Sequence, residues 1–333
     1  MKIVHGVLLV SGATLLLWLL YDTGLSTLWE DIRRFGWGLL VFVGLEGVAD
    51  IFHALAMRLC FREDERRVPL WELWKVRVAG GAINYLTPTA TIGGEVAKVA
   101  LLERHVSRPG AAAAILVDKL SYVTAQLGLA GMGTAVLSWW IPIDRRLALS
   151  LFLAGASVGL GCFGFFWFQM TGRIGALIRR GFGDRVADGL LDRVGDVDES
   201  LRAYYRSHPW ALVVSIAWHV VGLCCGIVAT YLFLSFVVGR GSWLFAAAIW
   251  MIGTLVDIAA FLVPAGIGAQ EGGRMLAFSM LGLAKSAGLA YGVVLRIEQL
   301  FFAALGMAIY PLMLAGSRAA GPSGRERCSG ELR

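Results

Sequence analysis

Two short segments of a very apolar chain carry the same polar residue types at the same spacing. The first segment, 87–102, reads TPTATIGGEVAKVALL, and the second, 263–276, reads VPAGIGAQEGGRML. In each, a proline is followed seven residues later by a glutamate and ten residues later by a basic residue. The two triplets are Pro88, Glu95 and Lys98, then Pro264, Glu271 and Arg274. This repetition predicts two equivalent sites.

The residue types in these segments suit the binding of an anionic group. We expect a helix to restart after Gly93 and Gly94, which places Glu95 and Lys98 on neighbouring turns of one face. A helix N-terminus attracts phosphate or carboxylate, and a basic residue one turn later strengthens that attraction. In the alternative interpretation the glutamate caps its own helix and the basic residue pairs with it. Charges inside a membrane are destabilising by roughly 2.5–3.5 kcal/mol at a helix centre, which favours the functional interpretation.

The elements that must position these residues are transmembrane helices. Of the 333 residues, 57% are hydrophobic and 16% are charged, whereas soluble domains carry about 25% charged residues. Several apolar runs approach or exceed the roughly 20 residues that cross a bilayer as a helix. We therefore predict an all-α polytopic membrane protein with about six full transmembrane helices. They lie at about 3–20, 36–61, 109–141, 147–170, 209–238 and 287–315.

Two further apolar segments, 73–102 and 242–283, are interrupted in the middle by proline and glycine. Proline removes a backbone donor and clustered glycine favours an unwound backbone. Unwound backbone at membrane depth persists only where protein or a hydrated cavity satisfies its polar groups. Both segments are therefore predicted to be re-entrant hairpins or discontinuous helices. The interrupting residues are Pro88, Gly93 and Gly94 in the first, and Pro264, Gly266 and Gly268 in the second.

The distribution of basic residues predicts that the two hairpins enter from opposite sides. With both termini inside, the large basic clusters all fall on the inner side if each hairpin returns to the side it came from. Units 73–141 and 242–315 then form an inverted repeat within one membrane domain, 1–316. The polar loop 171–208 is predicted to contain an amphipathic inner-side helix, either lying on the membrane or solvated as a linker. The tail, 317–333, is predicted to be disordered.

Other ionisable residues lie inside the predicted spans. Glu46, Asp50 and His53 are spaced i, i+4 and i+7, so they form one stripe on the second span. The stripe lines a hydrated path or, equally, forms an internal network that fixes helix packing. Asp257 precedes the second break and either completes that site or satisfies the broken backbone. His219 is favoured as a structural residue.

The span that follows each hairpin carries a charged pair as well. Asp118 and Lys119 follow the first hairpin, and Arg296 and Glu298 follow the second. We expect Asp118 to neutralise Lys98 or to line the pathway.

Several classes of function lack support in this sequence. The five cysteines show no metal-ligand spacing, no Ser/His/Asp arrangement stands out, and the glycines around the first motif follow no strand and lack the Walker lysine. The basic residues form no aromatic-basic surface motif. We therefore predict no catalytic motif, metal, cofactor or nucleic-acid partner.

The pattern PTATIGGEVAKVALLERH…ILVDKL, followed further on by PAGIGAQEGGRML, resembles the transmembrane region of lysylphosphatidylglycerol synthases and their stand-alone flippase-like relatives. The residues that match the first family motif are Pro88, Gly93, Gly94, Glu95, Lys98, Asp118 and Lys119. Those that match the second are Pro264, Gly266, Gly268 and Glu271. Ala265 stands where the family usually has glycine, which weakens any inference about backbone geometry there.

This resemblance implies a flippase-like protein of the bacterial inner membrane that moves a charged-headgroup lipid between leaflets. The lipid is a phospholipid, an aminoacyl-phospholipid, a hopanoid or a glycolipid. The sequence ends in a short polar tail rather than a soluble aminoacyl-transferase domain, so we do not expect synthesis of lysyl-lipid. Two alternatives remain: a scaffold that docks a lipid-biosynthesis enzyme through 171–208, and an intramembrane enzyme that uses the same carboxylates.

Overall fold

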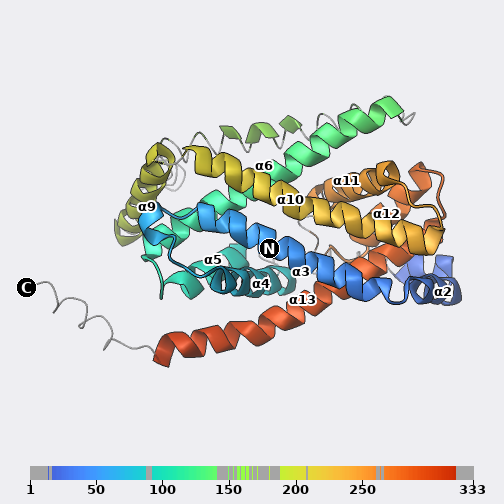
Figure 1. The fold of residues 1–333 in the computed structure, drawn as a ribbon, viewed down its shortest axis with the longest axis horizontal. Helices are drawn as coiled ribbons and strands as arrows, with labels where there is room; N and C mark the ends of the chain where they lie inside the picture. The colour runs from blue at the N-terminus through green and yellow to red at the C-terminus, as the bar shows by residue number, and fades with distance from the viewer. Residues whose placement is uncertain are drawn as a thin grey trace, which may run out of the picture.

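A computed structural model of the chain describes residues 17–87, 92–140, 188–207, 209–259 and 266–319, with isolated positions elsewhere. Within these ranges the chain is helical, without strands (Figure 1). The helices are α2 (Leu25–Phe35), α3 (Gly38–Leu59), α4 (Leu70–Leu86), α5 (Ile92–Leu102), α6 (Arg108–Trp140), α9 (Asp188–Ser207), α10 (Pro209–Phe233), α11 (Trp243–Ala259), α12 (Ala269–Met280) and α13 (Lys285–Ala319), with short helical turns η1 (Glu63–Glu65) and η3 (Leu234–Val238). Pro88, Pro264, the predicted tail from 320 and most of the predicted spans 3–20 and 147–170 lie outside the described residues.

Three of the described helices are both long and apolar enough to cross a bilayer. They are α3, α10 with its continuation η3, and α13. Their bounds agree within a few residues with the predicted spans 36–61, 209–238 and 287–315. The predicted span 109–141 coincides with α6, a helix of 33 residues. The protein is thus a helical membrane protein, and the full set of six spans remains a prediction.

Both segments that proline and glycine interrupt are pairs of helices separated by a break. The pair α4–α5 and the pair α11–α12 each pack as neighbours. Leu73 and Leu102, at the outer ends of α4 and α5, belong to one hydrophobic core cluster. Ala246 and Phe278, towards the outer ends of α11 and α12, belong to another. The two helix pairs therefore belong to different core clusters, and Figure 1 shows them at separate positions along the long axis.

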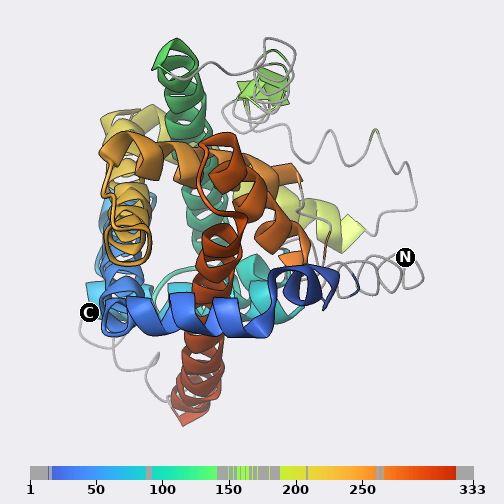
Figure 2. The same cartoon turned by 90° about the vertical axis from the view of Figure 1, so that its right-hand side faces the viewer.

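Contacts between the helices tie the two halves of the chain together. α3 packs along α10, α4 packs against α13, and α6 packs against α11. α2 contacts α13 and η3 and lies across one end of the bundle, which faces the viewer in Figure 2.

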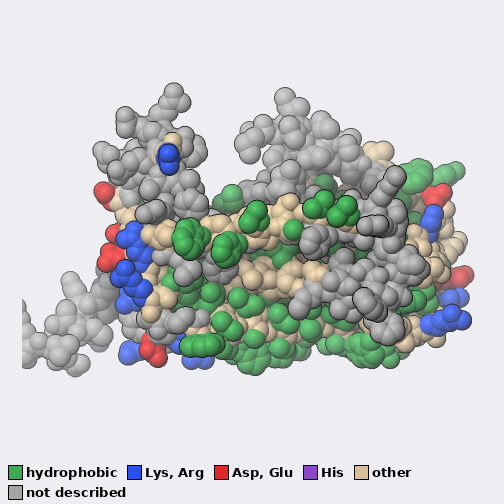
Figure 3. Space-filling view, turned by 90° about the horizontal axis from the view of Figure 1, so that it is seen from above, with side chains coloured by type: hydrophobic (Ala, Val, Ile, Leu, Met, Phe, Trp, Pro, Cys, Tyr) green, Lys and Arg blue, Asp and Glu red, His purple; other side chains and the backbone are tan. Residues whose placement is uncertain are grey.

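The surface has the character of a protein that faces lipid. Figure 3 shows charged side chains gathered towards both ends of the long axis, with an apolar stretch between them. On α3, Leu40, Val48 and Ile51 are exposed, whereas His53 is buried. An apolar exterior around a polar interior is the arrangement expected where lipid replaces water as the solvent.

The contact between α4 and α5 depends on glycine. A Cβ atom on Gly94 would lie 2.1 Å from the carbonyl oxygen of Gly80, so the two backbones approach more closely than any side chain allows. α5 begins at Ile92, so the expectation that a helix restarts only after Gly93 and Gly94 was wrong. At Gly94 the sequence uses glycine for close helix packing and not for an unwound backbone.

Candidate functional site

In the first hairpin, Glu95 is the centre of a small polar cluster. Its carboxylate accepts a hydrogen bond from Lys98 Nζ at 2.9 Å and lies 3.5 Å from Lys119 Nζ of α6. Asn84, near the end of α4, donates to Glu95 Oε1 at 3.3 Å and accepts from the backbone N–H of Gly94 at 2.7 Å. The structure thus brings together both motif charges and the lysine of the following helix, and Glu95 holds two ammonium groups.

In the second hairpin, Glu271 is almost fully buried, with 1% of its surface exposed. Its Oε1 accepts hydrogen bonds from Nε and Nη2 of Arg296 at 3.0 and 2.6 Å. Its Oε2 accepts from the backbone N–H of Gly268 at 2.9 Å, so Glu271 caps its own helix. Gly266 and Gly268 have φ values of 60° and 77°, a left-handed conformation that favours glycine and positions this cap.

Arg274 does not pair with Glu271, although the spacing matches that of Lys98 and Glu95. Its guanidinium donates two hydrogen bonds to Asp257 of α11, at 2.8 and 2.7 Å, and a third to the carbonyl of Gly253 at 3.0 Å. A bidentate carboxylate on the facing helix is a better partner for a planar guanidinium than a residue on its own helix. Asp257 therefore completes the second site.

The two clusters are joined at the deep end of α4. Arg296, which holds Glu271, also donates from Nη1 to the hydroxyl of Tyr85 at 3.0 Å. Tyr85 follows Asn84, which holds Glu95. Two consecutive residues of one half-helix therefore connect the glutamates of the two hairpins.

A third cluster lies between α3, α4 and α6 and is centred on Arg77. Its Nη1 donates to Asp118 Oδ2 at 3.2 Å, and its Nε lies 3.7 Å from Asp50 Oδ1. Asp118 pairs with Arg77 and so does not serve as the main partner of Lys98. Arg77 was not among the residues predicted to form the site. The sequence signal was present, because Arg77 lies inside the apolar segment 73–102 between two valines.

The polar stripe of α3 points into this interior. His53 Nδ1 lies 2.9 Å from Nδ1 of His219 on α10, and His219 Nε2 lies 3.2 Å from Asp118 Oδ1. His219 is therefore part of a charged network and not an isolated core residue. Glu298 of α13 is buried, and the groups that act on it electrostatically include Glu46 of the same stripe.

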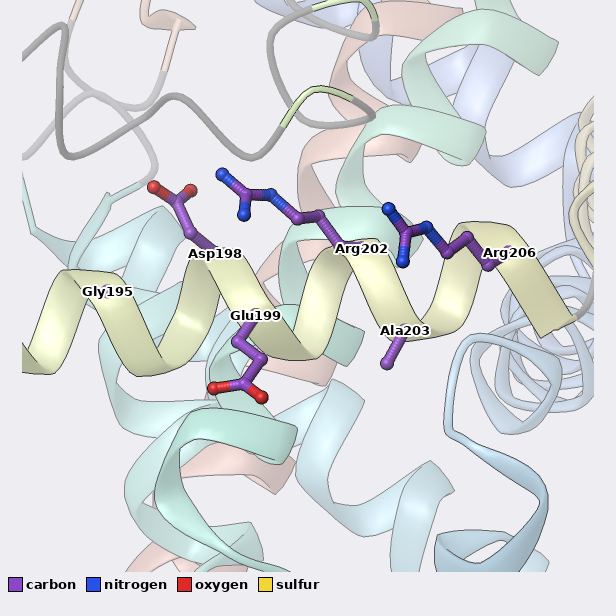
Figure 4. Close-up of a pocket in the computed structure, with 6 residues that line it drawn as sticks. All are labelled: Gly195, Asp198, Glu199, Arg202, Ala203 and Arg206. Carbon is purple, nitrogen blue, oxygen red and sulfur yellow. The ribbon is translucent and has the colours of Figure 1, made fainter.

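The predicted loop 171–208 contains α9, and a shallow pocket lies on its surface (Figure 4). Leu201 and Tyr204 of α9 are buried in the core cluster that also holds the outer ends of α4 and α5. The pocket is lined by Gly195, Asp198, Glu199, Arg202, Ala203 and Arg206. None of these residues contributes to the three clusters above.

Comparison with known proteins identifies the family of this chain but no individual relative. The sequence model of the lysylphosphatidylglycerol synthase TM region matches residues 3–306. No curated protein matches the chain, and no solved structure matches it.

Proposed function

The chain belongs to the lysylphosphatidylglycerol synthase TM-region family, and from this premise we propose that it moves a phosphate-bearing lipid between the two leaflets of the bacterial inner membrane. The observation that carries this proposal is the link between the two motif glutamates through Asn84 and Tyr85. A connected polar site supplied by broken helices from both ends suits a headgroup that must pass the middle of the bilayer. We further propose that the hairpins form an inverted repeat and that both termini are cytoplasmic.

The distribution of charge in the first hairpin favours an anionic headgroup. Lys98 and Lys119 share a single carboxylate, that of Glu95, which leaves one positive charge without a matching negative one. In the second hairpin, two carboxylates match two guanidinium groups. A phosphate that displaces Glu95 from one lysine completes the charge balance of the first hairpin. Lys119 is the accessible partner, because 38% of its side chain is exposed.

The apolar exterior accounts for the rest of the lipid. Charged groups are destabilising in the hydrocarbon layer and usually face the interior of a bundle. In this protein the charges of the clusters lie inside, while large apolar side chains such as Leu40 and Ile51 face outward. The acyl chains therefore stay in the bilayer while the headgroup follows the polar interior.

Transbilayer movement in proteoliposomes tests this proposal. The probes are fluorescent phosphatidylglycerol and a fluorescent neutral glycolipid, with chemical quenching of the outer leaflet. We expect faster movement of phosphatidylglycerol in the presence of the protein. Lys119→Gln and the double variant Glu95→Gln/Glu271→Gln should slow it by about tenfold or more, equivalent to roughly 1.4 kcal/mol.

Glu103→Gln is the matched control, because Glu103 pairs with Arg108 outside the clusters. Equal rates in the native protein, in folded Lys119→Gln and in this control would refute the site. Movement of the glycolipid alone would refute the phosphate specificity.

A second candidate function, docking of a lipid-modifying enzyme, is favoured by the α9 pocket. Its exposed Arg202 and Arg206 form a charged surface on a helix that is anchored to the bundle. Capture of a partner enzyme that depends on these arginines and not on Glu95 or Glu271 would support the scaffold. A lipid product that forms only with the intact protein would instead support an intramembrane enzyme.

A further inference from the structure

We propose that Asp118, His219 and His53 form a proton-transfer chain that couples proton movement to lipid movement. The coupling part rests on the proposed function, whereas the chain itself does not. The three side chains come from three helices, α6, α10 and α3, and each is buried. Their polar atoms form an unbroken series, with 3.2 Å between Asp118 Oδ1 and His219 Nε2 and 2.9 Å between the two Nδ1 atoms.

Unpartnered atoms mark the Asp118 end of this chain. Within the described residues, Asp118 Oδ1 and His219 Nε2 are buried and have no hydrogen-bond partner, and the two atoms lie 3.2 Å apart. Two buried polar atoms without other partners strongly favour a shared proton, since leaving either unsatisfied is destabilising. His219 Nε2 therefore carries the proton that faces the carboxylate.

This assignment determines the protonation of the second ring. With its proton on Nε2, neutral His219 has a bare Nδ1 that can only accept a hydrogen bond. His53 Nδ1 must then donate across the 2.9 Å contact, which leaves His53 Nε2 bare as the end that receives a proton. His53 is thereby held in the Nδ1–H form.

Proton transfer along the chain conserves every proton. A proton that arrives at His53 Nε2 is followed by transfer of the His53 Nδ1 proton to His219 Nδ1. The His219 Nε2 proton then moves to the Asp118 carboxylate. The product has two neutral rings with reversed tautomers and a neutral Asp118. Release towards the other side reverses these transfers or passes the proton on from Asp118.

The charges around the chain connect it to the hairpins. The groups that face the histidine pair are Asp118 and Tyr122 from α6, Arg77 from α4, Lys98 from α5 and, one turn before His53, Asp50. Arg77 is the ion-pair partner of both Asp50 and Asp118, so its interactions depend on the charge of Asp118. A neutral Asp118 attracts Arg77 less strongly. Arg77 lies on α4 and Glu95 on α5, so protonation of Asp118 acts on the hairpin that carries Glu95.

The packing around His53 provides a variant that changes no titratable group. A Cβ atom on Gly222 of α10 would lie 2.6 Å from Cε1 of the His53 ring and 2.9 Å from both ring nitrogens. Gly222→Ala should therefore displace the ring and break the contact between the two histidines. Gly44 of α3 has open space beyond its Cα, so Gly44→Ala is the matched control.

The first experiment is nitrogen-15 NMR of histidine-labelled full-length protein in lipid bilayers. We expect the Nδ1–H form for His53 and the Nε2–H form for His219 when both rings are neutral, with loss of this fixed pattern in Asp118→Asn and Gly222→Ala. Gly44→Ala should keep the native pattern. If both rings carry their proton on Nε2 in the native protein, no proton lies between the Nδ1 atoms and the chain is refuted.

The second experiment compares movement of fluorescent phosphatidylglycerol with and without a pH gradient across the vesicle. We expect acceleration by the gradient in native protein and its loss in His219→Gln and Gly222→Ala. His105→Gln is the control, because His105 is exposed and lies outside the clusters, and it should keep the acceleration. If native protein moves the lipid at the same rate with and without the gradient, coupling is refuted and the proposed function is not. Absence of any lipid movement would refute the proposed function and the coupling together, and the NMR pattern would still decide whether the chain exists.

Discussion

The hairpins α4–α5 and α11–α12 are built alike but balance their charges differently. In both, a glycine of the first half-helix makes room for the basic residue of the second. A Cβ atom on Gly80 would lie 2.5 Å from the Lys98 side chain, and one on Gly253 would lie 2.9 Å from the Arg274 guanidinium. Four residues after each glycine the hairpins differ, with an amide at Asn84 and a carboxylate at Asp257.

This single difference accounts for the pairing in each hairpin. Asp257 neutralises Arg274, so Glu271 is left to pair with Arg296 and to cap its helix. Asn84 neutralises nothing, so Lys98 and Lys119 both turn to Glu95. In the second hairpin both cations have a carboxylate partner and the motif glutamate is buried. In the first, two lysines share one carboxylate and the motif glutamate is more accessible, with 19% of its side chain exposed against 1% for Glu271. We therefore expect structural effects to be largest in the second hairpin and ligand effects to be largest in the first.

The largest contrast is expected between the two motif glutamates. Glu271→Gln should destabilise the protein by about 3–5 kcal/mol, because it leaves the Arg296 charge without its buried partner. Glu95→Gln should cost less, about 1–2 kcal/mol, because the amide oxygen still accepts from the buried Lys98 and Lys119 remains partly solvated. Denaturant-induced unfolding in detergent micelles, followed by circular dichroism, measures both. Equal losses would show that the hairpins do not differ in this way.

Removal of the Asp257 carboxylate tests why the second hairpin is saturated. Asp257→Asn should destabilise by about 3 kcal/mol, because the buried Arg274 loses its bidentate partner and keeps only the Gly253 carbonyl. Asp196→Asn, on the exposed face of α9, is the control and should change stability by less than about 0.5 kcal/mol. The same unfolding assay applies, and a change at Asp257 no larger than that of the control would contradict the assigned role.

The glycine beneath Lys98 should tolerate no side chain, unlike its neighbour. Gly80→Ala should destabilise by about 1–3 kcal/mol, because the new methyl group meets Lys98 and the Gly94 carbonyl. Gly81→Ala points into open space and should stabilise α4 by up to about 1 kcal/mol. Thermal unfolding of the two variants in the same detergent compares them directly. A destabilising Gly81→Ala, or a neutral Gly80→Ala, would argue against the close packing of α4 on α5.

The smallest stability effect is expected at Lys119. Its side chain is partly exposed and lies 3.5 Å from Glu95, so Lys119→Gln should cost less than about 1 kcal/mol. Arg296 is its counterpart on α13, and Arg296→Gln should cost several-fold more because Glu271 is buried. Unfolding of the two variants side by side checks this ratio. A large loss of stability at Lys119 would mean that its role is structural rather than in ligand binding.

Much of the fold was predictable because it depends on local sequence. The lengths of the apolar runs in α3, α10 and α13 match the thickness of the bilayer. Proline together with glycine indicates where a helix ends. The segments 73–102 and 242–283 were therefore correctly predicted to be broken. Glu95 and Lys98 were correctly placed on one face, since three residues separate them on one helix. The start of α5 was misplaced because the sequence does not reveal that Gly94 lies against α4.

The partners of the charged side chains were decided by tertiary structure. Tyr85 meets Arg296 across 211 residues, and His53 meets His219 across 166. The contacts of Arg77 with Asp118 and Asp50 likewise join three different helices. The sequence by itself identified the charged residues that must find partners inside the membrane. Burying an unpaired charge is destabilising whichever residue its partner is, so each such charge stands out in an apolar chain. The packing of helices from both halves of the chain decides which partner each charge meets. An ion pair forms only within a few ångströms, and the way the helices cross determines which side chains come that close.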